Sequence, residues 1–257
     1  MIPKVIHYCW FGKNPLPSNI KKCIKSWEKY CPDYEIRRWD ESNFDVLSHP
    51  FIKAAYEEKK WAFVSDYARL KVVYDYGGIY LDTDVELLRN LDFLLNYNFY
   101  VGVQQADRLC NTGLGFGAKK HCLLVLNMMK QYDNLIFDLN KQSEFACPIL
   151  NNRVIVDIGY NYSDSLVEIH DCAILPCKML DPVAPGRSRD LLCKDSVSIH
   201  HYTATWQNKK NRLRRKIFVF VGQRRINKIK KMCSDFNCFL TSFWSYITSC
   251  ICFWRNK

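Results

Sequence analysis

Apolar and polar positions follow clear periods along the N-terminal part of the chain. A short aromatic-rich run, Val5–Phe11, ends at Gly12 and predicts a strand. Apolar residues then recur at helical spacing from Ile20 to Trp27, and Cys31-Pro32 marks the predicted end of that helix. The run Tyr34–Trp39 predicts a second strand. A strand, a helix and a strand in this order are typical of α/β proteins, so we expect an α/β fold.

The next segments continue this alternation. Residues 50–60 predict a polar helix, and Trp61–Tyr76 predicts a second helix with one apolar stripe that ends at Gly77-Gly78. Beyond them the pattern predicts a buried strand from Ile79, further strands at 99–103, 154–158 and 197–201, and a helix at 123–131. The glycine-rich segment 113–117 lacks the spacing of a dinucleotide-binding motif and is interpreted as a flexible loop.

Composition narrows the class of protein. The chain has 257 residues, of which 48% are apolar and 25% charged, which excludes collagen-like and largely disordered classes. Its 13 cysteines are an odd number without any Cys-x-x-Cys pair, so we expect reduced, mostly buried thiols rather than a disulfide framework or a zinc site. The N-terminus shows no signal-peptide pattern, and we expect a cytoplasmic protein.

The strongest local signal is the run Ile79-Tyr80-Leu81-Asp82-Thr83-Asp84, which begins apolar and becomes acidic. In an extended strand alternate side chains share a face, so Asp82 and Asp84 are expected to point to the same side. Two carboxylates in one small volume repel each other unless a cation compensates them, which makes the pair a candidate site for a hard metal ion. Two solvated carboxylates at a strand exit are the alternative.

Two further pairs accompany these carboxylates. Asp66 and Arg69 lie three residues apart on one face of the predicted helix, as a surface ion pair or as part of a site. One imidazole of His200-His201 is a candidate to complete a metal shell, and Trp206 is a candidate to cover a sugar or phosphate. Adjacent histidines on their own are more often structural.

Four segments in order resemble one family of enzymes. They are Ile2–Gly12, Ser65–Arg69, Gly77–Asp84 and His200-His201. Together they resemble the Asp-x-Asp glycosyltransferases that include yeast initiating mannosyltransferases and bacterial capsule enzymes, and also the glucosylating domain of large clostridial toxins. The resemblance covers residues 2–206. It implies a GT-A type fold with a Rossmann-like mixed sheet and flanking helices, a nucleotide-sugar donor, a Mn²⁺ or Mg²⁺ ion, and retention of anomeric configuration.

The resemblance also implies roles for individual residues. It puts the base and ribose of the donor near the first strand, around His7, Tyr8 and Trp10. The residues implied to contact the donor sugar or ribose are Asp66, Arg69, Tyr80 and Asp82. The implied metal ligands are Asp82, Asp84 and one of His200 and His201. The family usually has Ser-Trp after the paired histidines, where this chain has Thr205-Trp206. By analogy with related enzymes, Asn111 is expected to face the acceptor.

Charge separates the C-terminal end from the body of the chain. Up to Thr205 there are 24 basic against 25 acidic residues, and from Trp206 onward 13 against 1. A basic run over 209–231 precedes 19 uncharged, aromatic-rich residues, Phe236–Trp254. We expect a catalytic domain over 1–207 and a membrane-associating tail over 208–257, lying in the plane of an anionic membrane; a transmembrane helix and a core-packed helix are the alternatives.

The expected function follows from these parts. It is metal-dependent, retaining transfer of a hexose or N-acetylhexosamine from a nucleotide sugar, with a UDP-sugar favoured. The expected acceptor is a capsule, O-antigen or lipopolysaccharide glycan, free or lipid-linked, at the cytoplasmic face of the membrane. A protein-modifying, toxin-like glycosyltransferase is one alternative. A nucleic-acid-binding protein that uses the basic tail is another. The uncharged aromatic segment of the tail favours membranes instead, so we expect no nucleic-acid partner.

A chain that ends at Asn208 tests the role expected of the tail. It keeps every residue assigned to donor and metal, so donor hydrolysis should persist while binding to anionic liposomes and transfer to a lipid-linked acceptor fall. Co-sedimentation with liposomes measures binding, and high salt should weaken binding of the full chain only in part. Loss of donor hydrolysis in the shortened chain would contradict the assignment.

Overall fold

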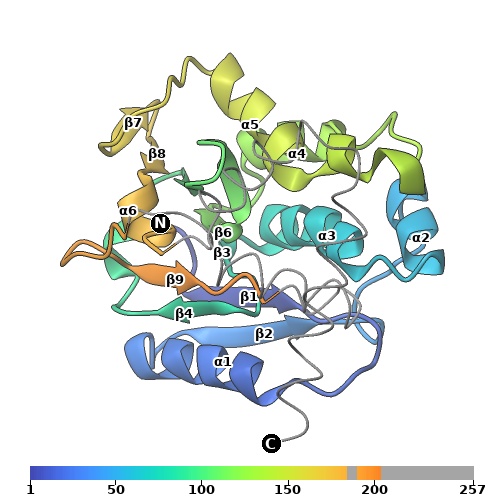
Figure 1. Cartoon of the computed structure of the whole chain (residues 1–257), viewed down its shortest axis with the longest axis horizontal. Helices are drawn as coiled ribbons and strands as arrows, with labels where there is room; N and C mark the ends of the chain where they lie inside the picture. Colours follow the sequence, from blue (N-terminus) through green and yellow to red (C-terminus); the bar gives the residue numbers. More distant parts are fainter. Residues whose placement is uncertain (184–189, 204–257) are drawn as a thin grey trace, which may run out of the picture. The chain divides into compact units, whose positions relative to one another are not determined.

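The computed structural model describes residues 1–183 and 190–203 and has an α/β architecture built on a seven-stranded mixed sheet (Figure 1). Its strand order is β2-β1-β3-β6-β5-β8-β7. The strands are β1 (Val5–Cys9), β2 (Glu35–Trp39), β3 (Gly78–Tyr80), β5 (Phe99–Val103), β6 (Cys110–Ala118), β7 (Val167–Ile169) and β8 (Cys172–Leu175). β1 pairs in parallel with β2 and β3, and β5 with β8, whereas β6 runs antiparallel to both β3 and β5. The predicted α/β class with a mixed sheet is confirmed.

A second, two-stranded sheet pairs β4 (Val85–Leu87) with β9 (Ser198–His200) in antiparallel register. The helices are α1 (Ser18–Tyr30), α2 (Pro50–Glu57), α3 (Trp61–Tyr76), α4 (Leu123–Lys130), α5 (Cys147–Asp157) and α6 (Cys177–Leu180), with 3₁₀ turns at Asp92–Leu94 and Leu139–Phe145. Figure 1 shows α2, α3, α4 and α5 on one side of β1 and β2, and α1 on the other. The main sheet is therefore covered on both faces.

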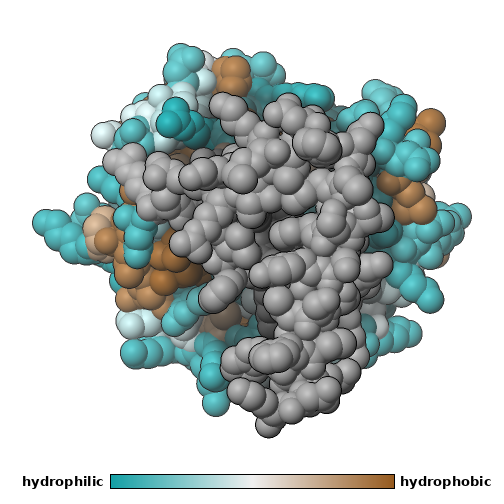
Figure 2. All heavy atoms as spheres, viewed as in Figure 1, coloured by the Kyte–Doolittle hydropathy of each residue, from teal (hydrophilic) through white to brown (hydrophobic). Residues whose placement is uncertain are grey.

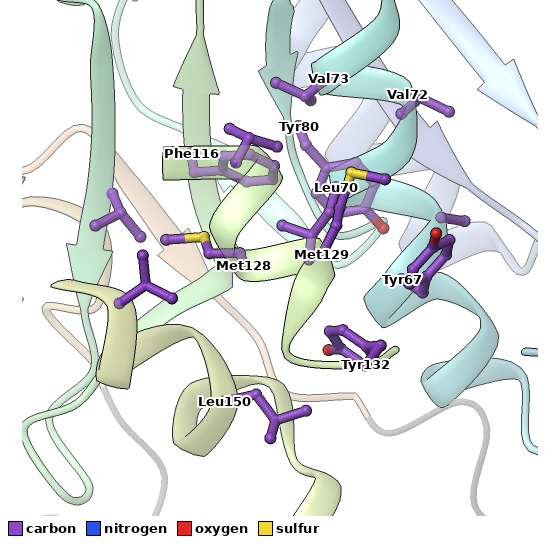
Figure 3. Close-up of a cluster of buried hydrophobic side chains, with 14 of the residues drawn as sticks. Tyr67, Leu70, Val72, Val73, Tyr80, Phe116, Met128, Met129, Tyr132 and Leu150 are labelled. Atoms are coloured by element: carbon purple, nitrogen blue, oxygen red, sulfur yellow. The ribbon is translucent and has the colours of Figure 1, made fainter. Parts of the chain in front are cut away.

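Two apolar cores fill the spaces between these layers. Strand residues alternate between them: on β5, Phe99 and Val101 join the larger core and Tyr100 joins the smaller one. In the larger core, side chains of α3 and α4 meet Tyr80 and Phe116 from the sheet (Figure 3). The smaller core surrounds Trp27 of α1, whose indole N–H also donates to the carbonyl of Val85, 2.8 Å away.

Most predicted elements of the N-terminal half are confirmed. The helix expected over Trp61–Tyr76 has those bounds, and its last turn ends at Gly77, whose φ of 69° suits glycine. The strand expected over 154–158 is wrong, because these residues lie in α5 and just beyond it. The buried residues of α5 recur at helical spacing from Cys147 onward, and a window restricted to the β-branched run misses that period.

The flexible loop expected over 113–117 is also wrong. These residues form the middle of β6, which is buried along its whole length. Glycine is required there by close contacts: a Cβ on Gly117 would collide with the Tyr100 ring, and Gly115 has a φ of 136° beside Leu81. The glycines therefore let a buried strand pass beneath neighbouring side chains.

The surface of the described residues is mainly hydrophilic on the face drawn in Figure 2, with apolar side chains in small separate patches. None of the helices within residues 1–183 and 190–203 has the length and hydropathy needed to span a bilayer. The expectations for the tail over 208–257 and for the domain boundary at 207 concern residues outside the described part of the chain.

Truncation of Phe116 tests the packing of the larger core. Phe116 is fully buried between Tyr80 and Phe99, so Phe116→Ala leaves a cavity and should lower the free energy of unfolding by about 3–5 kcal/mol. Urea denaturation measures the change. Leu123→Ala, at a side chain that is 65% exposed, is the matched control and should change stability by less than about 0.5 kcal/mol. Equal losses in both variants would contradict the description of this core.

Candidate active site

Asp82 and Asp84 lie in the turn that joins β3 to β4. The backbone N–H of Val85 donates to the carbonyl of Asp82, 2.9 Å away, so residues 82–85 close a turn. The expectation that both carboxylates alternate along an extended strand is therefore wrong, because the strand ends at Tyr80. Their carboxylate oxygens still approach each other, since the tight turn folds the chain back on itself.

The pairing of β4 with β9 brings a histidine to these carboxylates from the far end of the described chain. Val85 is in register with His200, whose Nε2 lies 3.0 Å from Oδ1 of Asp84 and 4.0 Å from Oδ2 of Asp82. One ligand atom from each of these three side chains lies within 4.8 Å of the others. His201 points elsewhere: its Nε2 is 2.7 Å from Oε2 of Glu86, and both side chains are exposed. The geometry thus favours His200 over His201.

This group fits a divalent cation. Two carboxylates and one imidazole are oxygen and nitrogen ligands that suit Mn²⁺, and Mg²⁺ with water completing its shell. The second oxygen of Asp84 accepts hydrogen bonds from the backbone N–H of Thr203 at 2.7 Å and from its hydroxyl at 2.9 Å. The carboxylate is therefore held in place with its other oxygen turned toward His200.

The protonation states agree with this arrangement. Burial raises the pKa of Asp84, but the charge and hydrogen bond of His200 and the two bonds from Thr203 outweigh it, so the pKa lies well below its usual value. Burial lowers the pKa of His200, but Asp84 and Asp82 more than offset it. Asp84 is accordingly anionic at neutral pH.

A second cluster adjoins the first around Arg69. Its guanidinium lies 3.0 Å from Asp66 and 2.9 Å from Asp82, and it stacks over the ring of Tyr80. The hydroxyl of Tyr80 also donates to Asp82, 3.1 Å away. The Asp66–Arg69 pair is therefore no surface ion pair: both side chains are buried. Burial, only partly offset by Arg69, raises the pKa of Asp66 to about 6.

Part of the wall around Arg69 was not predicted from the sequence. A Cβ on Gly113 would lie 2.5 Å from Oδ2 of Asp82, so β6 passes directly beneath that carboxylate. The predicted acceptor residue Asn111 is buried, and its side chain bonds to Gln104 and to the backbone of Gly113. Cys147, at the start of α5, lies 3.3 Å from Nη1 of Arg69. The glycine spacing 113-115-117 was the available signal, because alternate glycines in a strand clear one face of it.

The three residues predicted near the donor base differ from one another in burial and contacts. His7 is fully buried and accepts a hydrogen bond at Nδ1 from the indole of Trp39, while Nε2 lies 2.9 Å from the carbonyl of Gly77. Tyr8 faces the smaller core and packs edge-on against Trp27. The imidazole of His7 and the ring of Tyr8 thus make their contacts inside the protein, whereas Trp10 is partly exposed. Thr205 and Trp206 lie outside the described residues.

The comparisons with known proteins agree with this site. Residues 17–100 match the family described as the glycosyltransferase sugar-binding region containing a DXD motif. Inositol phosphoceramide mannosyltransferase 3 of Schizosaccharomyces pombe is 37% identical over 128 residues, 48% of this chain and 35% of that protein. Uncharacterized glycosyltransferase L373 of Acanthamoeba polyphaga mimivirus is 31% identical over 110 residues, 39% of this chain and 42% of that protein. The chain therefore spans less than half the length of either relative.

Among solved structures, the PaToxG glycosyltransferase is similar with a TM-score of 0.49 and 18% identity, over 61% of this chain and 68% of that one. The family match includes Asp66, Arg69, Asp82 and Asp84. The family match over residues 17–100 thus confirms the predicted resemblance to Asp-x-Asp sugar-binding glycosyltransferases.

The buried imidazole of His7 makes stability depend on pH. Burial lowers the pKa of His7 from 6.5 to about 4, so the unfolded chain binds more protons than the folded one between these values. The contribution of neutral His7 is fully present above pH 6.5 and is lost as the pH falls toward 4, by up to about 3 kcal/mol. Urea denaturation at pH 7 and pH 4.5 should show this loss in the parent chain and a smaller one in His7→Gln. An equal loss in both proteins would exclude His7 as its source.

Proposed function

We propose that this protein is a metal-dependent glycosyltransferase that uses a nucleotide-sugar donor. The observation that carries the proposal is the approach of Asp82, Asp84 and His200 within 4.8 Å, directly beside the buried Asp66–Arg69 pair. A cation-binding group and a sugar-binding group must be neighbours if the bond between an anomeric carbon and a diphosphate is to be broken.

The side chains divide this work between them. A bound Mn²⁺ or Mg²⁺ supplies positive charge that stabilises the diphosphate leaving group. Asp84 and His200 hold the ion, and the two hydrogen bonds from Thr203 fix the orientation of Asp84. Arg69 orients Asp66 and Asp82, whose remaining oxygen lone pairs accept hydrogen bonds from sugar hydroxyls. Transfer proceeds with retention of anomeric configuration, as the family resemblance implies.

The relatives suggest a second donor and a second acceptor. The yeast protein is named a mannosyltransferase of inositol phosphoceramide. We therefore add a mannose donor and a lipid acceptor with a polyol headgroup to the UDP-hexose donor and surface-glycan acceptor expected from the sequence. The proposed cytoplasmic membrane association of the basic tail is compatible with a lipid-linked acceptor.

A donor panel tests the proposal. The purified full-length chain is incubated with UDP- and GDP-linked hexoses and N-acetylhexosamines, with Mn²⁺, with Mg²⁺ or with EDTA, and released nucleoside diphosphate is measured. We expect hydrolysis of one class of donor, supported by Mn²⁺ and abolished by EDTA.

Substitution of Asp84 tests the role of the ion. Asp84→Asn removes a charged ligand and should lower donor hydrolysis at least about 100-fold while leaving the fold intact. His200→Ala should act in the same direction, and His201→Ala, whose side chain is exposed and paired with Glu86, is the matched control and should retain most of the rate. A normal rate for Asp84→Asn at saturating Mn²⁺ would refute the metal site.

A further inference from the structure

Two buried polar atoms next to the candidate metal site have no hydrogen-bond partner among the described residues. They are Nδ1 of His200 and Oδ1 of Asp181. One belongs to an imidazole, which carries a hydrogen on one nitrogen when neutral, and the other to a carboxylate, which accepts. Buried polar atoms destabilise the fold unless they are hydrogen-bonded, so the lack of a partner at both atoms needs an explanation.

Asp181 follows α6 and is fully buried. Its Oδ2 accepts hydrogen bonds from the backbone N–H of Gln105 at 2.7 Å and from the hydroxyl of Tyr202 at 2.8 Å. These two donors fix the plane of the carboxylate. Oδ1 remains available for a third donor.

Tyr202 connects this carboxylate to His200. The centroids of the Tyr202 and His200 rings are 4.0 Å apart, while the hydroxyl of Tyr202 reaches Asp181. Tyr202 has a φ of 49°, a conformation that costs energy for a bulky aromatic residue and that surrounding contacts must hold. The Tyr202 ring therefore packs against the imidazole, while its hydroxyl binds the carboxylate.

The charges of the two groups support the same connection. Burial lowers the pKa of His200, and the carboxylates of Asp84, Asp82 and Asp181 raise it. Burial raises the pKa of Asp181, and His200 is among the groups that lower it. Asp181 and His200 therefore interact electrostatically.

A nitrogen that binds a metal leaves the hydrogen on the other nitrogen. With Nε2 of His200 facing Asp82 and Asp84, the hydrogen belongs on Nδ1, which is the atom without a partner. Histidines that bind metals usually donate this second N–H to a carboxylate, a carbonyl or a water molecule, and loss of that acceptor weakens metal binding.

We propose that Asp181 is a positioning residue that receives the Nδ1–H of His200 through one ordered water molecule and so keeps Nε2 turned toward the cation. Since no direct hydrogen bond joins the two side chains, a bridging water is the simplest link. This inference rests on the metal site of the proposed function. It assigns the orientation of the imidazole to a residue outside the family-matched region 17–100.

Metal affinity measured without any donor tests the inference. Mn²⁺ alone is titrated into the full-length chain by isothermal calorimetry, and thermal unfolding is followed in EDTA. Asp181→Asn keeps the shape of the side chain but removes its charge, and should raise the Kd for Mn²⁺ about 10-fold or more. Tyr202→Phe, which removes only the hydroxyl bound to Asp181, should raise it by a smaller factor.

Asp92→Asn is the matched control. Asp92 also accepts a hydrogen bond from a tyrosine hydroxyl, that of Tyr34 at 2.8 Å, but it belongs to no group of candidate ligands, and its substitution should leave the Kd for Mn²⁺ unchanged. A crystal structure with Mn²⁺ should show the water between Asp181 and His200.

An unchanged Kd in Asp181→Asn would overturn the inference, as would a loss of Mn²⁺ binding matched by an equal loss in Asp92→Asn. If Asp181→Asn fails to fold, an unchanged Kd in Tyr202→Phe overturns it instead. Asp84→Asn separates this result from the proposed function. If Asp84→Asn also binds Mn²⁺ normally, the metal site itself is refuted. If Asp84→Asn loses Mn²⁺ binding while Asp181→Asn keeps it, only the role of Asp181 is refuted.

Discussion

The buried guanidinium of Arg69 is the group on which the geometry of the candidate site depends. It contacts Asp66 on its own helix and Asp82 on the turn after β3, so one cation joins two elements that approach from different directions. Without it, the buried carboxylate of Asp66 and the half-buried carboxylate of Asp82 would both lose their paired positive charge. Removing one partner of a buried ion pair typically costs about 3–5 kcal/mol, because the remaining charge is left uncompensated. Stability and the position of Asp82 are therefore coupled through a single side chain.

Asp82 and Asp84 are two residues apart in sequence, yet they have different surroundings. Asp82 accepts hydrogen bonds from Arg69 and Tyr80 and is also one of the three candidate metal ligands. Burial raises its pKa. Asp84 accepts two hydrogen bonds from Thr203 and faces His200, and its pKa is held low. Neighbouring carboxylates with different environments take different roles. Asp84 is the anion of the two at neutral pH, and Asp82 lies between the candidate metal ligands and the Asp66–Arg69 pair.

The parts of this site that were predicted from sequence are those encoded by local patterns. Helix α3 has a clear period and a glycine stop, and the spacing of Asp66 and Arg69 within it fixes their relative direction. The choice of His200 over His201 was not accessible, because it depends on the register of β9 against β4 across more than one hundred residues of chain. The interpretation of 113–117 as a loop failed for a related reason: glycine is a turn residue locally, and only contacts with Tyr100, Leu81 and Asp82 make it a strand residue here.

The register of β4 and β9 also determines when the site comes into existence. Asp82 and Asp84 leave the ribosome long before His200, and the two strands that align them are separated by most of the main sheet in sequence. Contacts between distant parts of a chain form late, since the intervening loop must be closed first. The main sheet through β8 can thus assemble around a pair of acidic residues that is still incomplete. Synthesis of the chain through residue 200 is therefore needed to bring the third side chain to Asp82 and Asp84, so a partly made protein has the main sheet before it has the complete candidate site.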